Sequence, residues 1–279
     1  MATIQELLTL GKEQLDSSGN EYSKYERKVL LEDVLGCNYM YMLMNGDEEV
    51  SPEKEQQYLE LIRRRVEHYP LQYLLGYAHF MDYTFVVNEN VLIPRNDTEV
   101  LVEQANEILD TMTGNSKVLD LCCGSGCIGI SLKLYHKGIH LYLSDVSEQA
   151  LKVAKKNLAK HDVTAEMICD DLLDGITENM DMIVSNPPYI ETQVIPTLTP
   201  EVKEYEPMMA LDGGEDGLNF YRRIVEESVS HLDEKGWLLF EIGYNQGEAV
   251  KELMIKQGFQ NVEVKKDYAG LDRIVYGHL

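Results

Sequence analysis

The residues with the clearest chemical signature are Asn186-Pro187-Pro188-Tyr189, which follow a short apolar run at 182–185. A proline has no N–H, holds φ at about −65° and pushes the residue before it into extended geometry, so Asn186 and Pro187 have little conformational choice. This stiffness fixes two acceptors, the Asn186 side-chain oxygen and the Pro187 carbonyl. They suit an –NH2 group on a flat π system, meaning a carboxamide or the amino group of adenine or cytosine. Tyr189 supplies a face for that plane or a hydroxyl at its edge.

A glycine-rich loop lies earlier in the chain and has the pattern Gly124-x-Gly126-x-x-Gly129. Glycines let the backbone approach a ligand closely, and the start of the helix expected after them favours an anion. Asp145 ends the next apolar run, where a carboxylate can accept hydrogen bonds from two ribose hydroxyls. The alternative role for Asp145 is a cap for the helix that begins near Ser147. The pattern predicts a site for an adenine nucleoside and does not distinguish NAD from S-adenosylmethionine.

A third acidic segment, Asp171-Leu172, follows the apolar run at 165–168, where a carboxylate or backbone group can meet an adenine amino group. We therefore expect the cofactor-binding residues to be Asp120, Cys122, Cys123, Gly124, Ser125, Gly126, Asp145, Asp171, Leu172 and Asn186. The expected catalytic residues are Asn186, Pro187, Pro188 and Tyr189.

The elements that must position these residues alternate between strand and helix from residue 117 onward. We expect strands at 117–121, 139–143, 165–168, 182–185 and 237–242, and helices at 127–135, 147–160, 218–232 and 246–257. Such alternation implies right-handed βαβ crossovers and a doubly wound, mainly parallel sheet, so the fold class is α/β. The last two strands, at 259–265 and 273–277, are joined by a connection too short for a parallel crossover and should be antiparallel.

The residues before the sheet have helical periodicity. Apolar positions recur at helical spacing before Gly19 and again before Gly36, and Ser51-Pro52 is a favourable start for a third helix. That helix carries Arg63-Arg64-Arg65, which we interpret as a solvated face and, on so acidic a chain, as a candidate docking site. Further on, apolar runs flank Asn88-Glu89-Asn90, and this pattern predicts a hairpin with its turn at that triplet. Asn96 or Asp97 is expected to cap the next helix.

Composition limits the class of partner. The 279 residues include 48 acidic and 25 basic side chains, for a net charge of −23, which disfavours non-specific binding to nucleic acid or to anionic membranes. The chain has neither a long apolar run nor a signal-peptide pattern at its start, so we expect a cytoplasmic protein. Its five cysteines form no repeating framework, which suits a reducing compartment. Cys122-Cys123-x3-Cys127 invites a metal interpretation, but it lies in a glycine turn without a nearby histidine, and we expect no metal.

The motifs together resemble one family of S-adenosylmethionine-dependent amino-methyltransferases, the PrmC (HemK) peptide-chain-release-factor glutamine methyltransferases. The likeness covers nearly the whole chain. Besides the proline motif, the glycine loop and Asp145, it rests on the segments at 70–76, 91–99, 210–218, 221–222, 241–243 and 269–273, which read PLQYLLG, VLIPRNDTE, ALDGGEDGL, YR, EIG and AGLDR. Two departures stand out, because the family usually has glycine at Cys122 and proline at Asn96. We expect a slightly displaced backbone at Cys122 and retained activity.

The resemblance implies methylation of the side-chain amide of the glutamine in the Gly-Gly-Gln motif of class I release factors, with S-adenosylmethionine as methyl donor and S-adenosylhomocysteine as product. It also implies a seven-stranded, Rossmann-like methyltransferase domain at 94–279 with one antiparallel strand. A small N-terminal all-helical substrate-recognition domain at 1–78 and a β-hairpin linker at 79–93 would precede that domain. We expect a monomer with a protein partner and no membrane or nucleic-acid partner.

Three other functions use some of the same features. An adenine-amino methyltransferase acting on nucleic acid would use the same two acceptors, but the acidic composition disfavours it. Glutamine methylation of a ribosomal protein would share the chemistry and differ only in the partner. A nucleoside-binding sensor or a nicotinamide enzyme would use the glycine loop but would not need the rigid acceptor pair.

Overall fold

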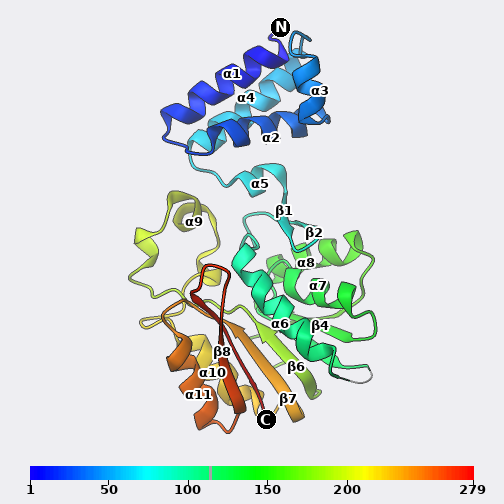
Figure 1. Ribbon diagram of the computed structural model, residues 1–279, viewed down its shortest axis with the longest axis vertical. Coiled ribbons are helices and arrows are strands. Elements are labelled where there is room, and N and C mark those ends of the chain that lie inside the picture. The colour runs from blue at the N-terminus through cyan, green and yellow to red at the C-terminus, as the bar shows by residue number, and fades with distance from the viewer. Residues whose placement is uncertain (113–114) are drawn as a thin grey trace. The chain divides into compact units, whose positions relative to one another are not determined.

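The structure, a computed structural model, describes residues 1–112 and 115–279 (Figure 1). The chain forms two compact units. The first contains Met1–Gly76 and, from much later in the chain, Thr199–Tyr205, and the second contains Tyr77–Leu198 and Glu206–Leu279. The predicted division at 78 and 93 did not include this return of a later segment to the N-terminal unit. No helix among the described residues is long and apolar enough to cross a membrane.

The first unit is helical, as predicted. Its helices are α1 (Ile4–Ser17), α2 (Ser23–Leu35), α3 (Tyr39–Met44), α4 (Pro52–Val66), α5 (Leu71–Leu75) and, from the later segment, α9 (Pro200–Tyr205). The predicted caps are present, since Gly36 ends α2 in the left-handed conformation and the Ser51 hydroxyl accepts a hydrogen bond from the Lys54 N–H at the start of α4. The side chains of α1, α2 and α4 share one apolar core.

The arginine triplet on α4 is not a uniform solvated face. Arg63 is exposed and pairs with Glu60 and Glu67 on its own helix, as expected for a surface residue. The Arg65 side chain is 8% exposed and forms hydrogen bonds of 2.7 and 3.1 Å to the buried carboxylate of Glu26, and it also pairs with Glu201. The interpretation was therefore wrong for Arg65, because helical periodicity turns it toward the core of this unit.

The β-hairpin exists, but its predicted turn was misplaced. Strands β1 (Tyr77–Phe80) and β2 (Tyr83–Val86) are antiparallel, so the two-residue turn is Met81-Asp82, with Met81 at φ +51°. Asn88 does form a local turn, because its side chain accepts a hydrogen bond from the Asn90 N–H, but residues 91–93 form no strand. Phe80 and Phe85 are buried and pack edge to face, and this packing fixes the register of the hairpin.

The sheet of the second unit has seven strands in the order β5-β4-β3-β6-β7-β9-β8, and all neighbours are parallel except for the pairs made by β9. This confirms the predicted doubly wound sheet and its antiparallel end. The strands are β3 (Lys117–Leu121), β4 (His140–Asp145), β5 (Glu166–Cys169), β6 (Met180–Ser185), β7 (Leu232–Glu241), β8 (Gln260–Lys266) and β9 (Asp272–His278). The carboxyl ends of β3, β4, β5 and β6 therefore meet at one edge.

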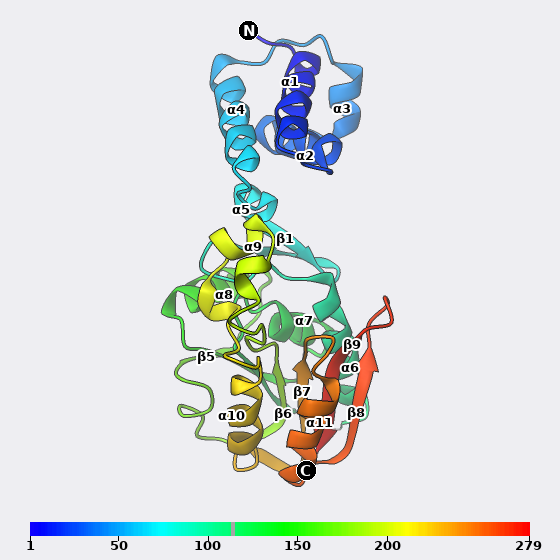
Figure 2. The same ribbon diagram turned by 90° about the vertical axis from the view of Figure 1, so that its left-hand side faces the viewer.

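Helices cover both faces of this sheet (Figures 1 and 2). One face carries α6 (Glu99–Leu109), α7 (Cys127–Tyr135) and α8 (Glu148–Lys160), and the other carries α10 (Asn219–Ser228) and α11 (Gly247–Lys256). Successive residues of a strand alternate between the two cores, as Val118 and Leu119 do. Three short 3-10 turns, at Asn96–Thr98, Ile195–Thr197 and Met208–Ala210, complete the unit. The expected side-chain cap by Asn96 or Asp97 is absent, because this 3-10 turn leads directly into α6.

Candidate active site

The glycine loop connects β3 to α7 and forms one wall of a cavity. Gly124 and Gly126 have φ values of +52° and +77°, the left-handed region that glycine adopts at little cost. A Cβ on Gly129 would lie 2.9 Å from the Cβ of Asp120, so the glycine allows α7 to pack closely on β3. The predicted loop pattern thus has two physical reasons, a left-handed backbone at Gly124 and Gly126 and close packing at Gly129.

Cys122, which stands where the resembled family has glycine, also has a left-handed backbone, with φ +60°. A side chain in this conformation costs about 1–2 kcal/mol, because its Cβ crowds the following carbonyl. Leu172, at the β5 end of the same cavity, has φ +52°. Two strained non-glycine residues therefore line one site, the kind of place where backbone strain concentrates.

Asp120 lies beneath the loop and does not line the cavity. Its side chain is fully buried, one oxygen accepts a hydrogen bond of 2.8 Å from the Gly129 N–H, and the other has no partner among the described residues. Burial raises the pKa of Asp120 to about 7, an effect that the Gly129 hydrogen bond opposes and the nearby Asp145 charge reinforces. The structure therefore gives Asp120 a position that supports the loop, where the sequence predicted a cofactor contact.

Asp145 ends β4 at the cavity wall. One carboxylate oxygen accepts a hydrogen bond of 2.9 Å from the Gly124 N–H, and the other accepts one of 2.9 Å from the Ser147 N–H. Burial raises its pKa, and these two hydrogen bonds oppose the rise. Each oxygen keeps a further lone pair for a hydroxyl donor. The helix cap itself is Ser147, whose hydroxyl accepts a hydrogen bond from the Ala150 N–H, so Asp145 is tied to the glycine loop as well as to the start of α8.

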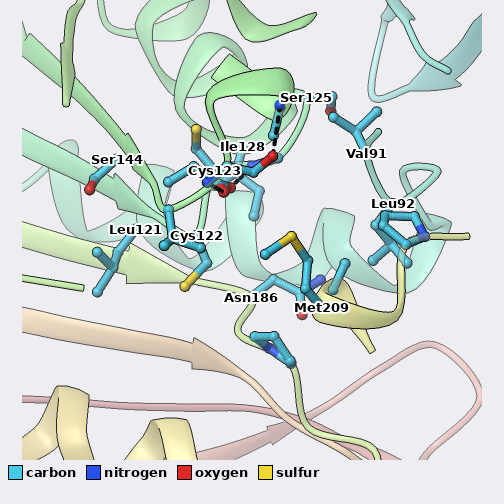
Figure 3. Close-up of a pocket in the computed structure, with 18 of the residues that line it drawn as sticks. Val91, Leu92, Leu121, Cys122, Cys123, Ser125, Ile128, Ser144, Asn186 and Met209 are labelled. Atoms are coloured by element: carbon cyan, nitrogen blue, oxygen red, sulfur yellow. Dashed lines mark hydrogen bonds between the residues drawn. The ribbon is translucent and has the colours of Figure 1, made fainter. Parts of the chain in front are cut away.

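Asn186 follows β6 directly and lines the same cavity (Figure 3). Its side-chain nitrogen donates a hydrogen bond of 3.4 Å to the Thr98 hydroxyl, which leaves the amide oxygen available as an acceptor. The Ser185 hydroxyl donates to the Leu121 carbonyl at 2.8 Å and joins the ends of the two neighbouring strands. The proline motif and the glycine loop are therefore held at one edge of the sheet.

The rest of the proline motif is divided between the cavity and the interior. Pro188 lines the cavity, whereas Pro187 and Tyr189 are not among its lining residues. The Tyr189 hydroxyl donates to the buried carboxylate of Glu241 at 3.3 Å, and its carbonyl accepts a hydrogen bond of 2.9 Å from the side chain of Gln246. Burial raises the pKa of the Tyr189 hydroxyl. The sequence did not predict this anchoring, which directs the hydroxyl away from the cavity.

The loop after β5 contributes Asp170, Asp171 and Leu172 to the lining, as the prediction for Asp171 and Leu172 required. The Asp171 carboxylate forms two hydrogen bonds, of 3.2 and 3.0 Å, with the guanidinium of Arg223. Its side chain is thus engaged with Arg223 of α10.

The space inside the cavity, including its open mouth, is about 1040 Å³. Sequence reasoning missed part of its lining, which includes Asn90, Val91, Leu92, Thr98, Ser144, Met209, Ala210 and Phe220. Figure 3 shows Val91 and Leu92 on the side away from Ser144. Thr98 lies inside the segment at 91–99 that carries the resemblance, and Phe220 lies between two other such segments, so the resemblance was the signal that could have found them.

Pro94 and Arg95 also line the cavity. Arg95 forms an ion pair with Glu206, whose carboxylate is almost completely buried and also accepts a hydrogen bond of 3.4 Å from the Ile93 N–H. Burial raises the pKa of Glu206, and the Arg95 charge opposes the rise. Arg95 therefore fixes the start of the segment at 206–210 that closes one side of the cavity.

The three cysteines of the loop have thiols whose pKa is raised by burial. Burial raises the pKa of the Cys127 thiol to about 12 and raises the pKa of the Cys122 and Cys123 thiols as well, so all three remain protonated at neutral pH. Metals bind the thiolate form. Among residues 1–112 and 115–279, no group of three side chains has the arrangement of a metal centre.

Comparison with known proteins decides the family. Residues 6–76 match the PrmC N-terminal domain, and residues 96–201 match the methyltransferase small domain. A release factor glutamine methyltransferase from Bacillus cereus is 40% identical over 283 residues, which cover 99% of each chain. The chain belongs to the release factor glutamine methyltransferase family. A second family member, from Clostridium acetobutylicum, is 36% identical over 98% of this chain and 97% of its own.

A solved structure supports the fold of this family member independently. A methyltransferase from Pyrococcus furiosus has a TM-score of 0.51, covers 82% of this chain and 98% of that chain, and is 15% identical in sequence. At that identity the likeness concerns the fold alone. The cavity therefore lies at the carboxyl edge of the sheet of a methyltransferase fold, in a chain of the release factor glutamine methyltransferase family.

Proposed function

We propose that this chain transfers a methyl group from S-adenosylmethionine to the side-chain amide nitrogen of the glutamine in the Gly-Gly-Gln motif of class I release factors. The observation that carries the proposal is the shared cavity of the glycine loop, Asp145 and Asn186 in a member of this family. The proposal thus combines a nucleoside-binding edge and a rigid acceptor for an –NH2 group in one site.

The residues present fit S-adenosylmethionine. Asp145 retains lone pairs for ribose hydroxyls, and Gly124 lines the cavity, whereas Gly126 packs against the side chains of Ile130 and Ala154. Phe220 adds an aromatic side chain to the lining, and Asp171 and Leu172 lie at the edge expected for the adenine. When bound, S-adenosylmethionine supplies an electrophilic methyl group on its sulfonium.

The chain's own contribution to the reaction is positioning. An amide nitrogen is a poor nucleophile because its lone pair is delocalised into the carbonyl. Placing two reactants in line supplies about 7–11 kcal/mol, whereas a general base typically supplies about 3–5 kcal/mol. In our proposal the Asn186 side-chain oxygen and the Pro187 carbonyl each accept one amide hydrogen of the substrate, and the nitrogen loses a proton after methylation. Pro187 and Pro188 restrict the backbone of Asn186 and Pro187 and so keep both acceptors rigid.

The remaining parts of the proposal concern the organisation of the protein. We propose that residues 1–78 recognise the release factor, that 79–93 link them to the catalytic part at 94–279, and that the protein is a cytoplasmic monomer without a metal cofactor. The acidic charge of −23 suits a partner with basic residues, because a release factor domain must itself enter ribosomal RNA.

The direct test of the mechanism is Asn186→Ala. This variant should lose methyl transfer, while its binding of S-adenosylmethionine, measured by calorimetry, should be weakened but detectable. Near-normal turnover of the variant would show that the Asn186 side-chain oxygen is not needed as an acceptor. Parallel incubations of the unmodified chain with labelled S-adenosylmethionine and a release factor, a ribosomal protein or duplex DNA separate the proposed substrate from the two alternatives.

A further inference from the structure

The lining of the cavity divides into two parts. The first part, which the proposed function gives to the cofactor, contains the glycine loop, Asp145 and the residues at 170–172. The second part comes from the segments at 90–98, 186–188 and 207–210. It contains the acceptor Asn186, and most of its other side chains have no role so far.

The second part offers few polar groups to a substrate. Its charged side chain is Arg95, which is already paired with the buried carboxylate of Glu206. Most of the other side chains there are apolar, among them Leu92, Pro94 and Pro207. A group that fits this part needs an amide for Asn186 and an apolar portion for the remaining wall. A glutamine side chain has this composition, because two methylene groups join its amide to the backbone.

Met209 is the most adaptable side chain of this wall. Figure 3 shows its thioether projecting from the segment at 206–210 into the cavity, and the residue is 55% exposed. Methionine has three rotatable bonds and a polarizable sulfur, so it adjusts to the shape of an apolar neighbour better than proline or alanine does. Single exposed apolar residues are common on protein surfaces. What distinguishes Met209 is its place in the same lining as Asn186.

The backbone that carries Met209 is fixed on both sides. Before it, the Glu206 carboxylate pairs with Arg95 and accepts a hydrogen bond of 3.4 Å from the Ile93 N–H. After it, Leu211 is buried, and its N–H donates a hydrogen bond of 3.0 Å to the Met208 carbonyl. The turn is therefore held in place, and the Met209 side chain is the part that can adjust to a ligand.

We infer that Met209 is a substrate-contacting residue whose side chain packs against the two methylene groups of the substrate glutamine, while Asn186 accepts from the amide of that glutamine. This inference rests on the proposed function, because it adds an apolar contact to the proposed acceptor. The contact is to the stem of the glutamine and not to the reacting nitrogen. It should therefore stabilise the bound substrate and the transition state to the same extent.

The test uses the full chain and a full-length release factor. Met209→Ala removes the contact, and Met209→Leu keeps an apolar side chain of similar volume. Met208→Ala is a matched control, because Met208 is the preceding residue of the same turn, is 53% exposed and is not among the residues that line the cavity. Each variant is measured for kcat, KM for the release factor, binding of S-adenosylmethionine and thermal midpoint.

We expect Met209→Ala to raise KM by about 4- to 15-fold, because burial of each methylene group contributes a factor of about four and the glutamine stem has two. The kcat should stay within about twofold, as it does when a variant loses an interaction common to the bound substrate and the transition state. Binding of S-adenosylmethionine should also stay within about twofold. Met209→Leu should recover most of the loss, and Met208→Ala should leave KM unchanged.

A second measurement observes the contact in the unmodified sequence. The NMR signal of the Met209 methyl group, identified by its absence in Met209→Leu, is followed in the chain with S-adenosylhomocysteine. It should shift when the release factor is added. A release factor with alanine in place of the motif glutamine should cause much less of this shift.

The possible failures are distinguishable. If the unmodified chain does not methylate the release factor, the proposed function fails and the role of Met209 falls with it. If the unmodified chain is active and Met209→Ala keeps KM within about twofold, the contact is overturned while the proposed function stands. An equal rise of KM in Met208→Ala also overturns it. If Met209→Ala is too unstable to assay, the NMR comparison decides, and an unchanged Met209 signal overturns the inference.

Discussion

Asp120→Asn should make the stability of the second unit less dependent on pH. The Asp120 carboxyl is fully buried under the glycine loop, and burial raises its pKa from 3.8 to about 7. In the native protein it therefore holds a proton that the unfolded chain releases at much lower pH. Stability from this group is complete below the unfolded pKa and is lost as pH rises through the folded one.

The magnitude follows from the shift. A rise from 3.8 to about 7 corresponds to about 4 kcal/mol in total, of which about 2–3 kcal/mol lies between about pH 5 and pH 8.5. An asparagine keeps an acceptor for the Gly129 N–H and cannot ionise. The difference in unfolding free energy, Asp120→Asn minus wild type, should therefore increase by that amount across this range.

The assay is urea unfolding followed by fluorescence of Trp237, the single tryptophan, which lies on β7 in the same sheet as Asp120. Asp212→Asn is the control. Hydrogen bonds from Thr192 and Gly214 lower the pKa of Asp212, so it is ionised throughout the range and its substitution should have a constant effect. Parallel curves for wild type and Asp120→Asn, with a difference constant to about 0.5 kcal/mol, would refute burial as the cause of the shift.

Two further predictions concern features that the structure added to the sequence analysis. Arg65→Met should destabilise the first unit by about 3–5 kcal/mol, because it leaves the buried Glu26 carboxylate without its charged partner and with only the neutral Asn20 amide as a side-chain donor, whereas Arg63→Met on the exposed side of α4 should cost less than about 1 kcal/mol. Urea unfolding by circular dichroism compares them, and equal effects would contradict the burial argument. Cys122→Gly should be more stable than Cys122→Ala by about 1 kcal/mol, the reverse of the usual order, because the backbone there has φ +60°. A more stable alanine variant in the same assay would show that the left-handed backbone carries no strain.

The sheet was predictable because its signals are local and periodic. The strand β3 and the helix α7 have the predicted bounds, and the antiparallel end followed from one short connection. The position of the hairpin turn was not predictable in this way. Asn88 has a strong turn propensity, but it forms only a local turn. The chain reverses at Met81-Asp82 instead, because buried side chains of the hairpin pack there. Tertiary packing decided between two possible turns.

The individual motifs of the site were predictable from the sequence, but the contacts between them were not. The motifs around Asp145 and Asn186 are recognisable in the sequence from their residue types, and both residues line one cavity in the structure. The contact between Thr98 and Asn186 joins segments 88 residues apart in sequence, for which no spacing rule exists. The interior position of Asp120 was missed for the same reason.

The most direct test of the central claim is tandem mass spectrometry of a class I release factor after incubation with this protein and S-adenosylmethionine. The peptide with the Gly-Gly-Gln motif should gain the mass of one methylene unit on the glutamine side chain, and replacing this glutamine should prevent the gain. An unmodified peptide, or a methyl group on any other residue, would contradict the account.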